Sequence, residues 1–135
     1  MNSAKIKRIP YVKEKSFEER LLETSRILEK YPTFIPCVVE KSPTAASDFG
    51  SQDKIKYLVP ENITFGQFML IIRRRLQLKP EHALYFFVDK RVLASVSLTL
   101  RELYNKYKSP CGFLFFEYAT ENTFGTTNSI LRARC

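Results

Sequence analysis

Residues 113–125 have the sequence FLFFEYATENTFG, and the organisation of the whole chain can be worked out from this segment. From Phe113 to Tyr118 aromatic residues dominate and Glu117 is the only charge, a composition typical of a β-strand. A strand this apolar belongs in the middle of a sheet, where both of its faces are covered. After Tyr118 small polar residues lead to an isolated Phe124-Gly125 pair. The segment therefore predicts a central strand followed by an exposed tail.

The tail allows two interpretations. Residues 126–135 show no periodicity and end in Arg-Ala-Arg-Cys. A segment of this kind is usually a frayed chain end, because terminal residues are poorly ordered unless something holds them. The alternative is a segment that the sheet presents to other proteins for cleavage or attachment.

Length, charge and cysteine content restrict the class of protein. The 135 residues suffice for one domain, and the longest apolar runs are far shorter than the ~20 residues of a membrane span. Three widely spaced cysteines and one histidine, His82, match no zinc or redox spacing, so we expect no metal, no cofactor, and reduced thiols in the cytoplasm. Cys37 and Cys111 are expected in or near the core. The net charge of +8 favours an acidic partner, which includes nucleic acid, anionic membrane and acidic peptide.

Three capping boxes predict three helices. In each, a Ser or Thr is followed three residues later by Glu or Gln, so that side chain and backbone satisfy each other at the helix start. The pairs are Ser16 and Glu19, Thr64 and Gln67, and Thr99 and Glu102. Apolar residues follow each box at helical spacing, and Tyr31-Pro32 should end the first helix. That helix is expected to turn its apolar stripe, Phe17, Leu21, Leu28 and Tyr31, toward the core.

Strands are predicted between these helices. Phe34–Lys41 and residues 84–88 are two of them, and Pro36 suggests that the start of the first is unpaired. Residues 54–60 alternate, with Ile55, Tyr57 and Val59 on one face and Lys54, Lys56 and Leu58 on the other. Lysines on a strand that ends in proline are typical of a sheet edge, where a peptide can add as a further strand. Residues 89–91 are expected to form a turn.

The order of these elements predicts the fold class. Strands grouped around one long helix favour an α+β fold over a wound parallel sheet. From Phe34 onward the order is that of the ubiquitin-like β-grasp, a mixed four-stranded sheet with a crossing helix, here preceded by N-terminal helices. The first fifteen residues form a basic arm, which is most simply a solvated surface.

With these elements placed, the sequence resembles the autophagy ubiquitin-like modifiers, the family of autophagy-related protein eight and its GABARAP-type relatives. The resemblance covers the chain from about Tyr11 to Gly125, in the family's order. It is carried by Phe17-Glu18-Glu19-Arg20, Lys30-Tyr31-Pro32, Ile35-Pro36-Cys37-Val38-Val39-Glu40-Lys41, Lys56-Tyr57-Leu58-Val59-Pro60, Thr64-Phe65-Gly66-Gln67-Phe68, Ile72-Arg73-Arg74-Arg75, Phe86-Phe87-Val88, Gly112-Phe113-Leu114 and Glu121-Asn122-Thr123-Phe124-Gly125.

The resemblance implies a conjugated tag and not an enzyme. Family members are cut after a terminal glycine by a cysteine protease, then passed through activating and conjugating enzymes to the amine of phosphatidylethanolamine. By position that glycine is Gly125, with residues 126–135 as the removed extension. The resemblance thus divides the chain into N-terminal arm and helices (1–32), a ubiquitin-like domain (33–119) and a flexible tail (120–135). It also implies a cytoplasmic protein that joins autophagosome and vesicle membranes after lipidation.

The resemblance also implies a site for autophagy receptors and adaptors, which present an aromatic-x-x-aliphatic peptide along the edge strand. The pocket for the peptide's aromatic residue would comprise Glu23, Ile27, Pro36, Lys56, Leu58 and Phe113. The pocket for its aliphatic residue would comprise Tyr57, Val59, Pro60, Ile63, Phe68 and Ile71. Lys54 and Lys56 would meet acids beside the aromatic residue, and Arg75 a carboxylate further along.

Three segments depart from the family pattern. Phe34 stands where relatives carry a basic or polar residue, so one charge contact is expected to be missing. The loop at residues 44–53 is about two residues longer than in relatives, so its charged residues do not align one to one with theirs. Residues 91–95 replace a proline-rich segment.

Other functions fit the sequence less well. Residues 112–118 partly match the aromatic signature of RNA-recognition domains, and the net charge agrees, but too few residues follow Tyr118 for the further helix and strand. A cysteine hydrolase using Cys37 or Cys111 with His82 lacks an orienting group. An interaction domain without conjugation remains an alternative. No specific nucleic-acid partner is expected.

Overall fold

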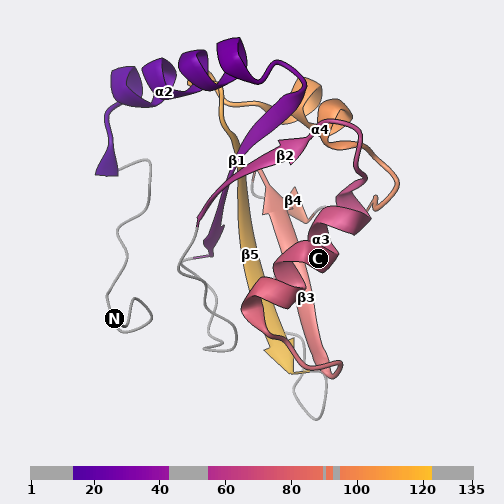
Figure 1. Ribbon diagram of the computed structural model, residues 1–135. Coiled ribbons are helices and arrows are strands. Elements are labelled where there is room, and N and C mark those ends of the chain that lie inside the picture. Colours follow the sequence, from indigo (N-terminus) through magenta and orange to yellow (C-terminus); the bar gives the residue numbers. More distant parts are fainter. Residues whose placement is uncertain (1–13, 43–54, 90, 93–94, 123–135) are drawn as a thin grey trace.

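The computed structural model describes residues 14–42, 55–89, 91–92 and 95–122 (Figure 1). Most of the basic arm, Lys54, Gly125 and the predicted extension lie outside these residues. The elements are α2 (Phe17–Lys30), β1 (Phe34–Lys41), β2 (Lys56–Pro60), α3 (Phe65–Leu76), β3 (His82–Val88), β4 (Arg91–Val92), α4 (Leu100–Tyr107) and β5 (Leu114–Asn122).

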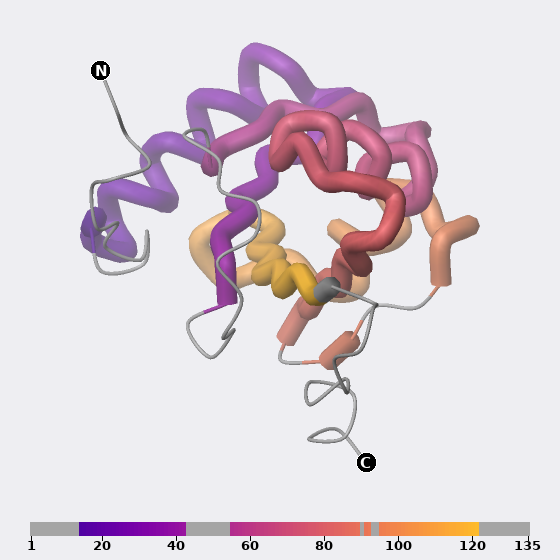
Figure 2. The backbone as a smooth tube through the Cα atoms, turned by 90° about the horizontal axis from the view of Figure 1, so that it is seen from below, coloured from indigo at the N-terminus to yellow at the C-terminus, as the bar shows by residue number. Residues whose placement is uncertain are grey.

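The strands form one mixed sheet in the order β2-β1-β5-β3-β4. β5 is central, parallel to β1 and antiparallel to β3, which confirms the prediction for the aromatic segment. Figure 2 shows β5 in yellow at the middle of the fold, with the other elements around it. The predicted α+β class is confirmed. The predicted number of strands is wrong, because Arg91 and Val92 form a fifth strand, β4, against Val88 and Phe87. Two residues are too few to show a periodicity in the sequence.

The central strand is longer than predicted. It continues past Tyr118 to Asn122, and Ala119, Thr120 and Glu121 pair with β3 and are buried. The expectation that small polar residues after Tyr118 stay off the domain is wrong as far as Asn122. Pairing with β3 uses backbone groups and does not require apolar side chains.

The three capping boxes are present as predicted, each with both reciprocal hydrogen bonds. α3 buries Phe65, Phe68, Ile72 and Leu76, as its stripe predicts, and α4 buries Leu100, Leu103 and Tyr104. The core between α3 and the sheet is aromatic. The ring centroid of Phe65 lies 5.4 Å from that of Phe86, and the centroid of Phe68 lies 5.5 Å from that of Phe116. Such pairs contribute ~0.5–1.5 kcal/mol each beyond the area they bury.

α2 is attached to the domain differently from the prediction. Its one buried residue is Thr24, while Phe17, Leu21 and Tyr31 are 41%, 42% and 39% exposed. The helix lies across one end of the sheet and extends beyond it, so most of its apolar stripe meets no surface of the part of the chain that the structure describes (Figure 1). Thr24 Oγ1 instead donates a hydrogen bond to the carbonyl of Cys111 (2.6 Å) in the turn before β5.

The second face of the sheet carries a smaller apolar cluster of Val38, Ile55, Cys111 and Phe113. Both Cys37 and Cys111 are buried free thiols, as predicted. Ile55 belongs to this second cluster while Val59 lies in the main core, so the predicted alternation fails at Ile55, which precedes β2. The start of β1 is also paired, with Pro36 opposite Leu58, contrary to the prediction. On the β5 side pairing begins only at Cys37.

Candidate peptide-binding site

β2 is an edge strand, as Lys54, Lys56 and Pro60 in the sequence predict. Among the residues that the structure describes it pairs only with β1, in a register that places Val59 opposite Ile35 and Tyr57 opposite Cys37. Backbone groups on the other side of an edge strand can accept a further strand. The two predicted side-chain groups lie at either side of this edge.

The first group brings α2 to the edge strand. Lys56 Nζ on β2 forms an ion pair with Glu23 Oε2 on α2 at 2.8 Å, and both side chains are partly exposed. Ile27 is half-buried on the same helix, and Leu58 is 39% exposed opposite the buried Pro36. An ion pair with this exposure contributes about 0–1 kcal/mol, so Lys56 can exchange its partner at low cost.

Phe113, predicted for the same group, has a different environment. Its side chain is 1% exposed and packs with Val38, Ile55 and Cys111 in the second cluster. The ring therefore belongs to the interior beneath the edge and not to its surface. Lys54 lies in the part of the chain that is not described.

The second group brings α3 to the edge strand. The rings of Tyr57 on β2 and Phe68 on α3 meet edge to face, with centroids 6.1 Å apart, and the guanidinium of Arg75 lies 5.9 Å from the Tyr57 centroid. Val59 and Phe68 are buried, and Ile63 is half-buried against the core. Ile71, at 40%, and Pro60 are exposed. This group thus has a rigid aromatic base with an apolar residue open beside it.

The turn between β2 and α3 is held by residues that the sequence analysis missed. Arg101 Nε on α4 forms an ion pair with Glu61 Oε1 at 2.8 Å, and the backbone N–H groups of Arg101 and Leu100 donate to the carbonyls of Glu61 and Ile63. These bonds fix the segment that carries Pro60 and Ile63 to the start of α4. Charges forty residues apart in the sequence give no local pattern, so no sequence signal could have identified this pair.

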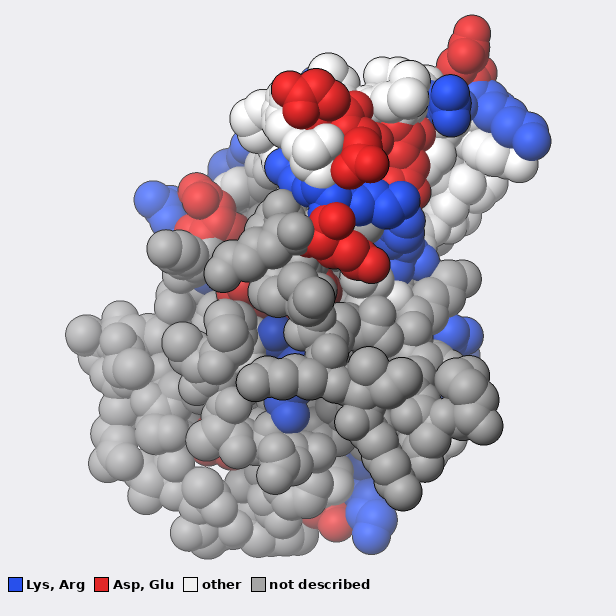
Figure 3. Space-filling model, turned by 90° about the vertical axis from the view of Figure 1, so that its left-hand side faces the viewer, with Lys and Arg blue, Asp and Glu red and all other residues white. Residues whose placement is uncertain are grey.

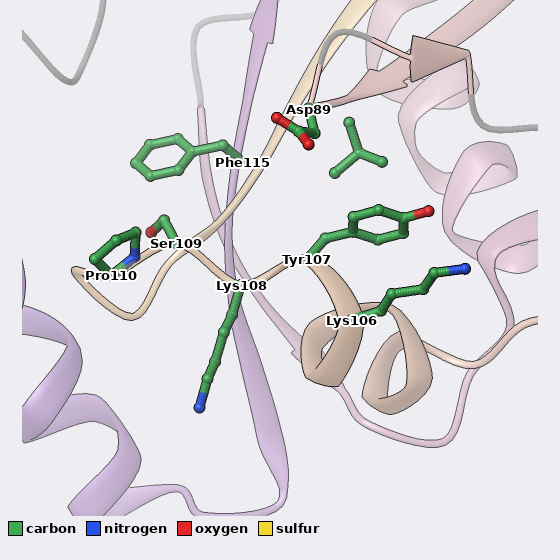
Figure 4. A pocket seen from close by; sticks show the side chains of 8 residues that line it. Asp89, Lys106, Tyr107, Lys108, Ser109, Pro110 and Phe115 are labelled. Atoms are coloured by element: carbon green, nitrogen blue, oxygen red, sulfur yellow. The ribbon is translucent and has the colours of Figure 1, made fainter.

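A separate cavity of about 380 Å³ lies between the end of β3, the end of α4 and the start of β5 (Figure 4). Its lining residues are Val88, Asp89, Lys106, Tyr107, Lys108, Ser109, Pro110 and Phe115. Figure 4 shows the Lys108 side chain pointing away from Asp89. None of the residues predicted for the peptide site lines this cavity.

Both cysteines considered for a hydrolase are buried. Burial raises the pKa of the Cys37 thiol well above its usual value, so the thiolate needed for attack is disfavoured. His82 Nδ1 accepts a hydrogen bond from the backbone N–H of Lys79 (3.3 Å). Within the described ranges, no group of three His, Cys, Asp or Glu residues could hold a metal ion. No helix in the same part of the chain is both long and apolar enough to cross a bilayer.

Comparisons with known proteins agree with this architecture. Residues 19–125 match the family model described as "Autophagy protein Atg8 ubiquitin like". Autophagy-related protein 8 of Schizosaccharomyces pombe is 46% identical over 111 residues, covering 82% of this chain and 89% of that protein. The protein of the same name from Mycosarcoma maydis is 43% identical over 118 residues, covering 87% and 98%. The crystal structure of Trypanosoma brucei ATG8 superimposes with a TM-score of 0.77 at 36% identity, covering 88% of this chain and 100% of that one. The similarity confirms the ubiquitin-like fold.

Proposed function

The chain belongs to the Atg8 family of ubiquitin-like autophagy proteins, and from this we propose that it is a conjugated tag that recruits receptor peptides to autophagic membranes. The observation that carries the proposal is the exposed edge of β2. It lies between side chains of α2, where Glu23 pairs with Lys56, and side chains of α3, where Phe68 packs against Tyr57. The partners are autophagy receptors and adaptors. The protein itself catalyses nothing; a cysteine protease, an activating enzyme and a conjugating enzyme act on it.

The receptor peptide would add as a strand beside β2. The peptide's aromatic residue would lie near Ile27 and Leu58, and its aliphatic residue would lie near Ile71. Leu58 on β2 and Ile71 on α3 are both exposed apolar side chains and can therefore make these contacts. Acidic residues of the peptide, next to its aromatic residue, would replace Glu23 as the ion-pair partner of Lys56. Since Phe113 is 1% exposed, the peptide's aromatic residue would reach its ring only after the side chains over it move.

The conjugation site would be Gly125. The family match ends at this residue, and β5 ends three residues before it, at Asn122. A protease thiolate would attack the Gly125 carbonyl and release residues 126–135. Water would then release the Gly125 carboxylate from the protease. The activating enzyme would convert this carboxylate into an acyl nucleotide at the expense of a nucleoside triphosphate and then into a thioester on its own thiol. The conjugating enzyme would take over the acyl group by thiol exchange, and the amine of phosphatidylethanolamine would finally displace the enzyme thiol to form the amide. The protein would thereby move from the cytoplasm to autophagosome and vesicle membranes.

Receptor binding is tested by removing the two exposed apolar side chains of the edge. Peptides of the aromatic-x-x-aliphatic type are expected to bind with Kd near ~1 μM, or about −8 kcal/mol. Leu58→Ala and Ile71→Ala should each weaken binding about tenfold in calorimetric titration, because each removes one apolar contact. Both residues are about 40% exposed, so the fold should tolerate the changes. Leu22→Ala, at 52% exposure on the outer face of α2, is the matched control. Equal affinity for all four proteins would place the peptide elsewhere.

Nucleic acid is not expected as a specific ligand. Acidic and basic side chains lie side by side over α2 on the face that Figure 3 shows, so the described residues there form no single basic surface. Any RNA binding should be electrostatic and fall steeply as salt rises. Fluorescence anisotropy with several RNA sequences, from low to physiological salt, measures the affinity and its dependence on salt and sequence. Tight, sequence-selective binding at physiological salt would contradict the proposal and favour the RNA-binding alternative.

A further inference from the structure

The outer face of α2 is a surface that the proposed function does not use. Leu22 is 52% exposed, and Leu21 beside it is 42% exposed. Thr24, which fixes the helix to the domain, is two residues from Leu22, and two residues correspond to roughly half a turn of an α-helix. Leu22 therefore points away from the domain. Figure 1 shows α2 at one end of the fold, with no other labelled element beyond it.

Charges alternate along this outer face of the helix. Residues four or seven apart lie on the same face, so Lys15, just before the N-cap, and Glu18, Leu22, Arg26 and Glu29 form one row. Glu14 and Glu19 lie beside its N-terminal half, and Lys30 lies beside its C-terminal half. Among the described residues neither Glu18 nor Arg26 forms an ion pair. The row therefore reads basic, acidic, apolar, basic and acidic from Lys15 to Glu29.

A row with this order is complementary to itself when reversed. We propose that the outer face of α2 binds the same face of a second copy of this chain, antiparallel, about a twofold axis through Leu22. Leu22 would face its own counterpart, and Glu18 would face Arg26 of the second copy. A twofold axis makes every such contact occur twice. By the same symmetry Lys30 would lie toward Glu14 of the second copy, and Glu29 would face Lys15 of the second copy.

This contact leaves the proposed peptide site free. Glu23 and Ile27 contribute to that site from another side of α2, where Glu23 pairs with Lys56. The contact is small and its ion pairs are exposed, so the dimer should be weak and should weaken further as salt rises. Self-association and peptide binding are therefore separate properties of the chain, and either can fail without the other.

Charge reversal provides a test with internal controls. Sedimentation equilibrium of the full chain at low salt should show a concentration-dependent dimer. Glu18→Arg alone and Arg26→Glu alone should each weaken dimerisation at least about tenfold, since each converts two attractive pairs into two repulsive ones. Mixing the two single variants should restore a dimer, because the arginine introduced in one variant would then face the glutamate introduced in the other. The double variant should recover dimerisation by itself.

A second set of variants separates this face from general hydrophobic association. Leu22→Arg should abolish the dimer, while Leu70→Arg, at a similar 54% exposure on α3, should not affect it. Circular dichroism confirms that each variant is folded. A wild type that stays monomeric at several hundred micromolar, or single charge variants that fail to associate on mixing, would overturn the proposal.

Discussion

Gly112→Ala is expected to lower the free energy of unfolding by roughly 2–4 kcal/mol, because the change combines backbone strain with overpacking. Gly112 has φ = +96°, a conformation that residues with a side chain rarely adopt. A Cβ atom there would lie 2.5 Å from Thr24 Oγ1 and 2.9 Å from Thr24 Cβ. Thr24 is the buried residue of α2, and its hydrogen bond to Cys111 holds that helix to the domain. The substitution should therefore loosen α2.

Neighbouring hydrogen bonds prevent the turn from relieving this clash. The Gly112 N–H donates to the Ser109 carbonyl (2.9 Å), and the Gly112 carbonyl accepts from the Tyr104 hydroxyl (2.8 Å). Gly66→Ala is the matched control, since Gly66 lies in the first turn of α3 and its added Cβ would lie no nearer than 3.3 Å to Val96 and 3.9 Å to Thr64 Oγ1. The free-energy cost of this close contact would be offset by the higher helix propensity of alanine, which is worth about 1 kcal/mol relative to glycine. Urea denaturation of both variants gives the comparison. Equal destabilisation would contradict the assigned role of Gly112.

Gly125→Ala is expected to block processing and lipidation almost completely. Glycine has no Cβ, so its carbonyl is open to a protease thiolate and its backbone can pass through a narrow channel. A methyl group at this position would obstruct each of the successive acyl transfers. Because Gly125 lies beyond β5, the variant should fold as the wild type does, which urea denaturation can verify. Gel mobility of the protein from cells, with and without autophagy induction, separates lipidated from unlipidated forms. A variant that is lipidated as well as the wild type would move the attachment site.

Much of the fold could be predicted because its signals are local. Each capping box fixes the start of a helix through residues three apart, and all three are present. The aromatic run around Phe116 predicts a central strand, and β5 is that strand. The prediction that both of its faces are covered is only partly right, because Glu117 is exposed. Lys54, Lys56 and Pro60 indicate an edge, which the sheet order confirms.

The features that could not be predicted depend on non-local geometry. Whether the stripe of Phe17 and Leu21 is buried depends on where α2 lies relative to the end of the sheet, and helical spacing does not contain that information. The ending of β5 depends on the length of β3, which continues to pair with it as far as Asn122. In the peptide site, an ion pair between Glu23 and Lys56 joins α2 to β2. The family resemblance placed both residues in the site, but the sequence does not show that they contact each other.

Mass spectrometry of the protein recovered from autophagy-active cells tests the central claim most directly. The wild type is expected to have lost residues 126–135 and to carry phosphatidylethanolamine on Gly125. The Gly125→Ala variant, recovered in parallel, should retain its full length to Cys135 without an adduct. A wild type that ends at Cys135 and carries no lipid would contradict the account and leave a ubiquitin-like binding domain that is not conjugated.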